Sequence, residues 1–245
     1  MKCEIGCEIE RIEQMIRNAV WQAGARGIVI GISGGIDSAV AAALCCGAVG
    51  AERVTGIALP SAVTAPEDLE HAALLARTLG FGLATVSIEP MLAGFRAMPD
   101  FVETPYLLGN LMARIRMATL YYHANRDGCL VCGTSNRSEF MIGYTTKFGD
   151  NAADIQPILH LYKTEVIELA RSLAIPGPIL DKPPSAGLWH GQTDEGEIGY
   201  DYASIDASLR SLEAHGWKPA SAAETAILTK VKESVHKRMP APHLL

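Results

Sequence analysis

The chain lacks several features that mark whole classes of protein. Its longest apolar run, from Ala39 to Val49, falls short of the about 20 residues that a membrane-spanning helix needs. Its first residues, Met1 to Glu8, include acids and contain no apolar signal core. No long block of Lys or Arg occurs, and the formal net charge is −6, whereas a nucleic-acid partner usually leaves a basic footprint. We therefore expect a cytoplasmic protein without a membrane or nucleic-acid partner.

Cysteine is also sparse, with six residues, and in a cytoplasmic chain we read them as reduced thiols. Cys129 and Cys132 form a C-x-x-C pattern, but they lie in an apolar stretch that is typical of a strand. Residues three apart on a strand point to opposite faces. We interpret both as small buried side chains, like Cys45 and Cys46 within a predicted helix, and a redox role of the pair stays open.

One glycine-rich turn stands out among the segments that the chain does have. The apolar run that begins at Ile28 predicts a buried strand, and the Ala/Leu-rich run after Ser38 predicts a helix. Between them, Gly34 and Gly35 let the backbone approach an anion closely. The helix N-terminus adds free N–H donors and the positive end of the helix dipole. This stretch predicts a phosphate site, although a turn without any ligand is the simpler alternative.

The same turn contains Asp37, whose carboxylate would repel phosphate unless a cation lay between them. We therefore predict Mg²⁺, which takes carboxylate and phosphate oxygens together. The turn lacks the Lys of a Walker A loop and the G-x-G-x-x-G spacing of a dinucleotide fingerprint. A second polar stretch, from Gly133 to Glu139, follows a predicted strand, and Glu139 could complete the Mg²⁺ shell. A solvated Glu at a helix start is the alternative.

Strand and helix patterns alternate along the chain. Strands are expected at 53–60, 82–88 and 130–134, and helices at 8–23, 66–79 and 106–124. This alternation predicts a single α/β domain over residues 1–245, with a doubly wound parallel sheet and helices on both faces. Ligands bind such sheets beyond the carboxyl ends of the strands. The Pro- and Gly-rich segment 176–200 is expected to act as a lid-like loop, and C-terminal helices near 203–215 and 221–235 follow it.

Taken together, the motifs resemble a known enzyme family over essentially the whole chain. They are the loop Ser33–Ser38 (SGGIDS), GTSNRSE at 133–139, YTTKFGD at 144–150, LYKTEV at 161–166, KPPSAGLW at 182–189, GQTDE at 191–195 and HKR at 236–238. The loop resembles that of the SGGxDS ATP pyrophosphatases, and the set resembles the synthetase domain of NAD synthetases. The resemblance implies a Rossmann-like, adenine nucleotide alpha hydrolase-like fold. It also implies a ligase that amidates nicotinic acid adenine dinucleotide (deamido-NAD) to NAD⁺ with ATP and ammonia. That reaction passes through an adenylated nicotinate and releases AMP and pyrophosphate.

The resemblance also implies roles for individual residues. Asp37 and Lys163 would be catalytic, and Asp37 with Glu139 would hold Mg²⁺. ATP would be bound by Gly31, Ile32, Ser33, Gly34, Gly35, Ile36, Asp37, Ser38, Thr134, Lys163 and Ser185. Deamido-NAD would be bound by Arg114, Lys147, Asp154, His236 and Lys237, across a homodimer that uses the helix at 106–124. Lys163 and Lys182 can offset charge on the leaving pyrophosphate.

Two positions depart from the pattern of that family. Asn151 and Ala152 replace a common pair of glycines, and Ser185 replaces a common Thr while keeping the hydroxyl. Two alternatives to a NAD synthetase remain at this stage. One is another amide-forming or thiolating SGGxDS enzyme, and the other is a nucleotide-binding sensor without chemistry.

Ammonia is the expected nitrogen donor. Its release from glutamine needs a nucleophile, usually Cys with a general base, in a domain of its own. Only residues 1–27 precede the glycine-rich stretch, which is enough for one helix. We predict that the isolated chain uses free ammonia, and a separate glutaminase subunit stays open.

Overall fold

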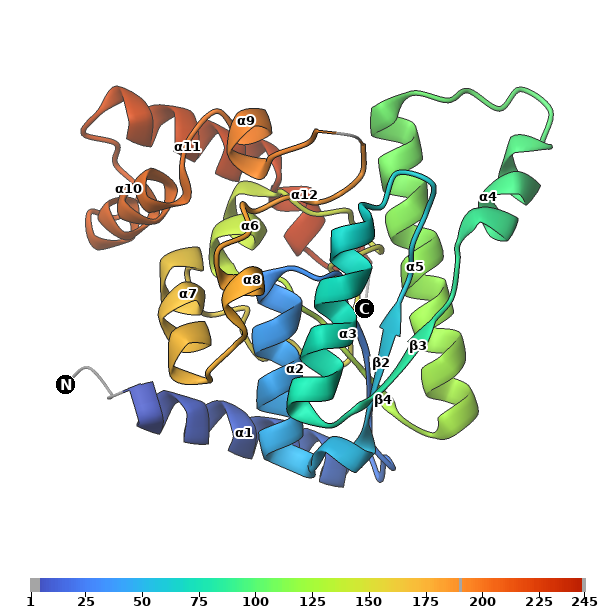
Figure 1. Cartoon of the computed structure of the whole chain (residues 1–245). Helices are drawn as coiled ribbons and strands as arrows, with labels where there is room; N and C mark the ends of the chain where they lie inside the picture. The colour runs from blue at the N-terminus through green and yellow to red at the C-terminus, as the bar shows by residue number, and fades with distance from the viewer. Residues whose placement is uncertain (1–4, 190, 244–245) are drawn as a thin grey trace.

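A computed structural model describes residues 5–189 and 191–243, which form a single α/β domain around a parallel sheet (Figure 1). The strands are β1 (Ile28–Gly31), β2 (Val54–Ala58), β3 (Gly82–Thr85) and β4 (Leu130–Cys132). Their order in the sheet is β3-β2-β1-β4, and every pairing is parallel. The strand order reverses beside β1, so the crevice for ligands is expected above the carboxyl ends of β1 and β4.

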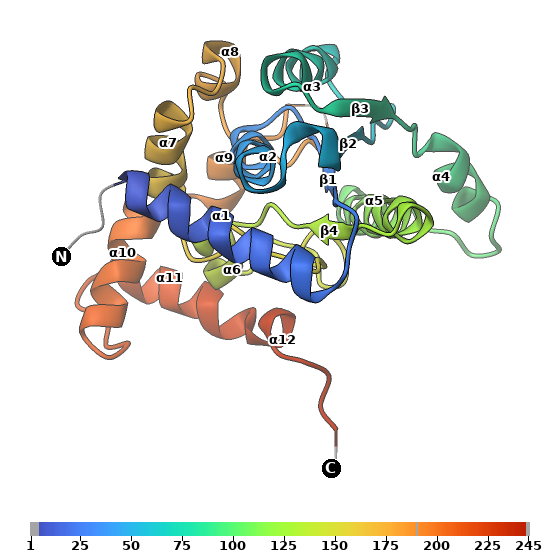
Figure 2. The same cartoon turned by 90° about the horizontal axis from the view of Figure 1, so that it is seen from below.

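Helices cover both faces of the sheet, as Figure 2 shows for α2 and α5 on either side of β1. One face carries α1 (Ile5–Gln22), α2 (Ile36–Val49) and α3 (Pro66–Leu79), and the other carries α4 (Glu89–Arg96) and α5 (Pro105–Asp127). Alternate residues of β1 explain this arrangement. Ile28 and Ile30 join the apolar cluster of the α2 face, whereas Val29 joins that of the α5 face. Both faces of the central strand are thus fully buried.

The chain after β4 builds a helical region around the carboxyl edge of the sheet. Its elements are α6 (Arg137–Ile142), α7 (Lys163–Ser172), α8 (Gly177–Leu180), α9 (Asp194–Ile198), α10 (Tyr202–Ala214), α11 (Ala222–Glu233) and α12 (Val235–Arg238). A short 3-10 helix, Ala51–Arg53, lies between α2 and β2. Ile205 and Ile227, from α10 and α11, share an apolar cluster with Ile142 of α6. The C-terminal helices therefore pack against the helix that follows β4.

The predicted doubly wound parallel sheet is confirmed, and so are the main helices and strands, with small differences at their ends. Gly80 ends α3 in the left-handed conformation, at φ 82°, as its position in the sequence indicates. Segment 176–200 contains the short helices α8 and α9, so it is not a structureless loop. The buried reading is confirmed for Cys132 and Cys45, whose sulfurs lie 3.6 Å apart in the core, whereas Cys46 and Cys129 are only partly buried.

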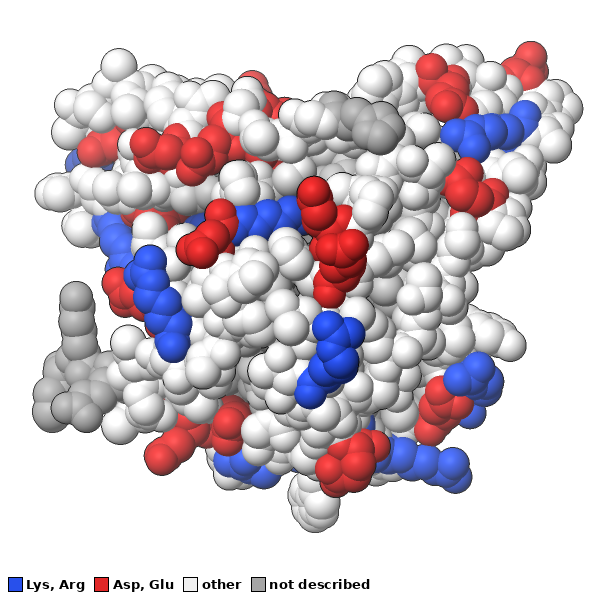
Figure 3. Space-filling view, in the orientation of Figure 1, with Lys and Arg blue, Asp and Glu red and all other residues white. Residues whose placement is uncertain are grey.

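No helix within the described residues is long and apolar enough to cross a membrane. Figure 3 shows one face of the molecule, in the orientation of Figure 1. Acidic and basic side chains are interspersed on it, and no continuous basic patch covers it.

Candidate active site

A cavity of about 700 Å³ lies at the carboxyl ends of the strands. Its floor is formed by Gly31 and the loop after β1, by Leu59 after β2 and by Thr134 after β4. One wall comes from α5, and another comes from the segment between Lys182 and Asp194. The cavity is thus at the crevice that the strand order predicts.

The glycine-rich loop shapes one side of this cavity. Gly34 has φ +80°, and a Cβ there would overlap the backbone of Asp68, so the close turn requires glycine. Ser38 Oγ donates to Gly35 O at 2.9 Å and lies 3.1 Å from Ser33 Oγ, which fixes the loop against the start of α2. Among the described residues, no side chain caps that helix start. Its first N–H groups are therefore available to an anion.

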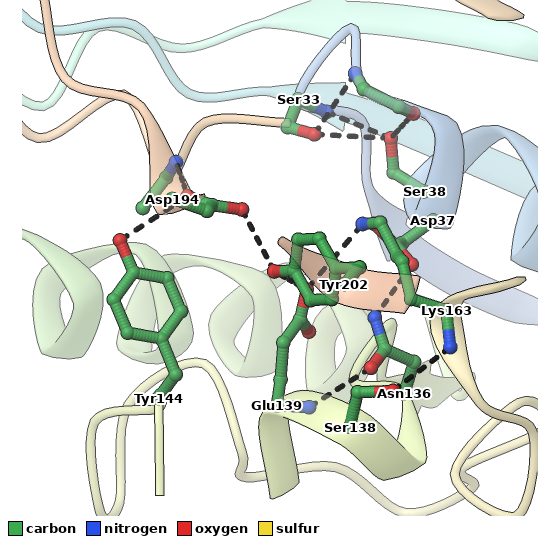
Figure 4. Close-up of polar contacts among 12 residues, drawn as sticks. Ser33, Asp37, Ser38, Asn136, Ser138, Glu139, Tyr144, Lys163, Asp194 and Tyr202 are labelled. Carbon is green, nitrogen blue, oxygen red and sulfur yellow. Dashed lines mark hydrogen bonds and ion pairs between the residues drawn. The ribbon is translucent and has the colours of Figure 1, made fainter. Parts of the chain in front are cut away.

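Behind the loop, Lys163 lies between two carboxylates (Figure 4). Its Nζ forms ion pairs with Asp37 and, at 3.5 Å, with Glu139 Oε1, and its residue is only 1% exposed. Asn136 Nδ2 donates to Asp37 Oδ1 at 2.9 Å. Burial alone lowers the pKa of Lys163, but Asp37 and Glu139 outweigh it, so the net pKa is raised and the ammonium form persists.

The pKa of Glu139 is higher than that of an ordinary carboxyl group in water. Burial and the charge of Asp37 raise it to about 8, although Lys163 opposes the shift. A buried carboxylate pair with a single cation is short of positive charge. The cluster therefore favours the arrival of a further cation.

A third carboxylate connects this cluster to the wall of the cavity. Tyr202 Oη lies 3.2 Å from Glu139 Oε1 and 3.0 Å from Asp194 Oδ2. Asp194 Oδ1 accepts hydrogen bonds from Ala186 N at 2.8 Å and from Tyr144 Oη at 3.2 Å. The segment before α9 is thus tied to the charged cluster through Asp194 (Figure 4).

The backbone that carries Lys163 is held from two other helices. Lys163 N donates to Ser138 Oγ at 2.9 Å, and Thr164 N donates to Asp206 Oδ2 at 2.9 Å. Ser138 Oγ also donates to Asp206. Side chains of α6 and α10 therefore cap the first turn of α7, which fixes the position of Lys163 at the start of this helix.

Comparison with known proteins decides the family. The family model for NAD synthase matches residues 8–241. The chain belongs to the NAD synthase family. It is 60% identical over 245 residues to the NH(3)-dependent NAD(+) synthetase of Methanoregula boonei, covering 100% of this chain and 99% of the relative.

Two solved structures share the fold of this chain. The structure of NMN synthetase from Francisella tularensis matches with a TM-score of 0.88 and 38% identity, covering 99% of both chains. NH3-dependent NAD synthetase from Campylobacter jejuni matches with a TM-score of 0.84 and 29% identity, covering 99% of this chain and 100% of that one.

In this member of the NAD synthase family, the side chains of Asp37 and Glu139 fit a magnesium ion. Asp37 and Glu139 both reach the ammonium group of Lys163, so their oxygens already converge on a positive charge. Two carboxylates with phosphate and water oxygens make an ordinary Mg²⁺ shell. No cluster of three or more His, Cys, Asp or Glu side chains in the described part of the chain could hold a metal by itself, so an ion at Asp37 and Glu139 would need substrate or water oxygens as well.

The other residues that the sequence singles out fall into two groups. Thr134, Ser185 and Lys237 line the cavity, and Lys237 Nζ donates to the carbonyls of Gly143 and Thr145, each at 2.7 Å. Lys182 also lines it, but its ammonium is ion-paired with Asp68.

The second group is not part of the cavity wall. Arg114 Nη2 donates to Lys147 O at 3.1 Å, and Lys147 Nζ donates to His236 O at 2.6 Å, so these three residues adjoin one another. The carboxylate of Asp154 accepts from Val131 N at 2.7 Å and from Tyr121 Oη at 3.2 Å. Their predicted contacts with a substrate remain predictions.

Sequence reasoning gave no role to Asp194, Tyr202 or Asp206. Asp194 lies inside the GQTDE motif, which was a signal for it. Tyr202 and Asp206 belong to no motif, and both act through contacts with residues distant in the sequence. Only the folded chain brings them to the site.

Proposed function

We propose that this protein catalyses the ATP-dependent amidation of deamido-NAD with ammonia, giving NAD⁺, AMP and pyrophosphate. One observation carries the proposal: a buried Lys163, Asp37 and Glu139 cluster lies beside a loop with free helix N–H groups, within one cavity. The relative from Methanoregula boonei, an NH(3)-dependent NAD(+) synthetase, supports it at 60% identity.

In this proposal, residues 31–38 bind ATP together with Thr134 and Ser185. All of these residues line the cavity except Gly34 and Ser38. The start of α2 receives the phosphates through its N–H groups. Asp37 and Glu139 would hold Mg²⁺, which supplies positive charge to the phosphate oxygens when it is bound. Lys163, kept as ammonium, offsets charge on the leaving pyrophosphate.

The chemistry then proceeds in two displacements. A carboxylate oxygen of the nicotinate attacks the α-phosphorus of ATP, and the bond from that phosphorus to the bridging oxygen breaks, which releases pyrophosphate. Ammonia next attacks the acyl carbon, AMP leaves with the oxygen that joined them, and one proton is released. The adenylated carboxylate must be kept from water until ammonia arrives. Segment 176–200 forms one wall of the cavity, and we propose that it acts as the lid.

The second substrate is proposed to lie along Arg114, Lys147, Asp154, His236 and Lys237. The first two suit the phosphates of a dinucleotide. A homodimer that uses α5 is part of the same proposal, because Tyr106, Leu107 and Tyr122 on this helix are exposed.

A shorter substrate is the second candidate. The Francisella tularensis neighbour is an NMN synthetase, at 38% identity. That likeness makes a mononucleotide with the same reacting carboxylate the alternative substrate for this chain. The cavity chemistry is the same for both, and only the far end of the substrate differs.

Turnover with a substrate panel tests the proposal. Purified protein with ATP and Mg²⁺ is given deamido-NAD or nicotinate mononucleotide, plus either an ammonium salt or glutamine free of ammonia. We expect amide and pyrophosphate in equal amounts with ammonium, the larger kcat/KM with deamido-NAD, and no product with glutamine. Glu168→Gln, on the exposed side of α7, should match the wild type. Pyrophosphate release without amide formation from either nucleotide would contradict the proposal.

A further inference from the structure

Arg116 is a cation inside the cavity that none of the roles above uses. It lies on α5, lines the cavity, and donates through Nε to Leu59 O at 3.0 Å, just beyond β2. No hydrogen bond or ion pair joins its two terminal nitrogens to any described residue. Arg114, two positions earlier, is about 200° away around the helix, is not a lining residue of the cavity, and donates to the carbonyls of Asn110 and Lys147.

The other cations of the cavity wall are already engaged. Lys163 is paired with two carboxylates, Lys182 with Asp68, and Lys237 with two carbonyl oxygens. Among the described residues of the wall, Arg116 is thus the cation with the most free donors. A guanidinium keeps its charge at any physiological pH and presents its N–H groups as a rigid fork.

Among the described residues, the partly buried charge of Arg116 has no ion-pair partner. Burial lowers the pKa of Arg116, and Asp150 opposes the shift only through space. The Asp150 carboxylate is engaged instead with Thr146 N, at 2.7 Å. A partly buried cation without an ion-pair partner favours the approach of an anion.

We propose that Arg116 binds a pair of anionic oxygens of a substrate through its terminal nitrogens. The inference rests on the proposed function, which brings two such groups to this cavity: the carboxylate of the nicotinate and the α-phosphate of ATP. Both fit the guanidinium fork bidentately. They also meet in the reaction, because the carboxylate oxygen attacks the α-phosphorus. Arg116 is then a catalytic residue that was absent from the sequence-based set.

Two substitutions test this role, with direct binding as the readout. Arg116→Gln removes the charge, and Arg116→Lys keeps the charge but loses the fork. Arg126→Gln, near the exposed end of the same helix and paired with Asp127, is the matched control and should behave as wild type. Titration calorimetry measures the Kd of Mg·ATP, of deamido-NAD and of NAD⁺, and thermal unfolding checks the fold.

We expect Arg116→Gln to weaken the binding of one substrate by about 10- to 100-fold, and Arg116→Lys to have an intermediate Kd. If the carboxylate is the partner, deamido-NAD weakens and loses its preference over the amide NAD⁺. If the phosphate is the partner, Mg·ATP weakens instead. The inference would be overturned if both variants fold and every Kd stays within about threefold of the wild-type value. Binding is measured without turnover. If the wild type makes no NAD⁺, the proposed function is wrong, but the binding test of Arg116 still gives an answer.

Discussion

Replacement of Lys163 by Met gives the sharpest test of the charged cluster. Lys163 is 1% exposed and balances Asp37 and Glu139 at once. The methionine fills a similar volume but leaves the carboxylate of Asp37 without its cation, beside Glu139, whose pKa is already raised to about 8. We expect the variant to lose both stability and turnover, for separable reasons.

The size of the loss follows from the burial. Removal of one partner from a buried ion pair costs about 3–5 kcal/mol, because the remaining charge is uncompensated. In a protein of this length, each 1 kcal/mol shifts Tm by about 2–4 °C, so Tm should fall by roughly 6–20 °C in EDTA. Mg²⁺ should restore much of that loss, because it binds the folded carboxylates and not the unfolded chain.

Thermal unfolding in EDTA and in Mg²⁺ measures this, beside pyrophosphate release. Lys182→Met is the matched control, because the Lys182 side chain in its pair with Asp68 is 25% exposed, whereas that of Lys163 is 2% exposed. That variant should lose only about 1 kcal/mol or less and show no special response to Mg²⁺. The kcat of Lys163→Met should fall about 100-fold or more even with Mg²⁺. A Tm within about 2 °C of wild type in EDTA would refute the charge balance assigned to Lys163.

Three further predictions concern the same cavity. Asp37→Asn should abolish pyrophosphate release at saturating Mg²⁺ with an unchanged circular dichroism spectrum, and near-normal release would remove its metal role. Segment 176–200 and the loop 147–151 should gain hydrogen-exchange protection with ATP and deamido-NAD, and unchanged protection in both would count against a lid. In the metal-free protein, burial first and then Asp37 raise the pKa of Glu139 to about 8, against the opposing charge of Lys163. The folded state then holds the extra proton, so stability falls as pH rises from 4.5 to about 8. Urea unfolding in EDTA should show that the free energy of unfolding falls less with pH in Glu139→Gln than in the wild type. An equal slope in both proteins would disprove this prediction.

The parts of the fold that follow from local pattern could be predicted from the sequence. The apolar run at Ile28, the glycines and the Ala-rich run predicted β1, the turn and α2, although α2 begins at Ile36, before the predicted start after Ser38. Asp37 and Glu139, which follow two parallel strands, both reach Lys163, and their role as Mg²⁺ ligands stays a prediction.

Elements and contacts that depend on distant parts of the chain were not predicted. The helix α4 is eight residues long and contains Pro90 and Gly94, so its local signal is weak. The partner of Lys182 is Asp68, which is 114 positions earlier and has no local relation to it. The capping of α7 by Asp206 likewise arises only when α10 packs against it.

Isotope transfer tests the central claim, that this cavity adenylates a carboxylate, most directly. Deamido-NAD labelled with ¹⁸O in its nicotinate carboxylate is turned over with ATP, Mg²⁺ and ammonium, and the products are analysed by mass spectrometry. Because the attacking oxygen stays on the α-phosphorus when ammonia displaces AMP, one labelled oxygen should appear in AMP and none in pyrophosphate. Label in inorganic phosphate with ADP as co-product, or unlabelled AMP beside labelled water, would contradict the account.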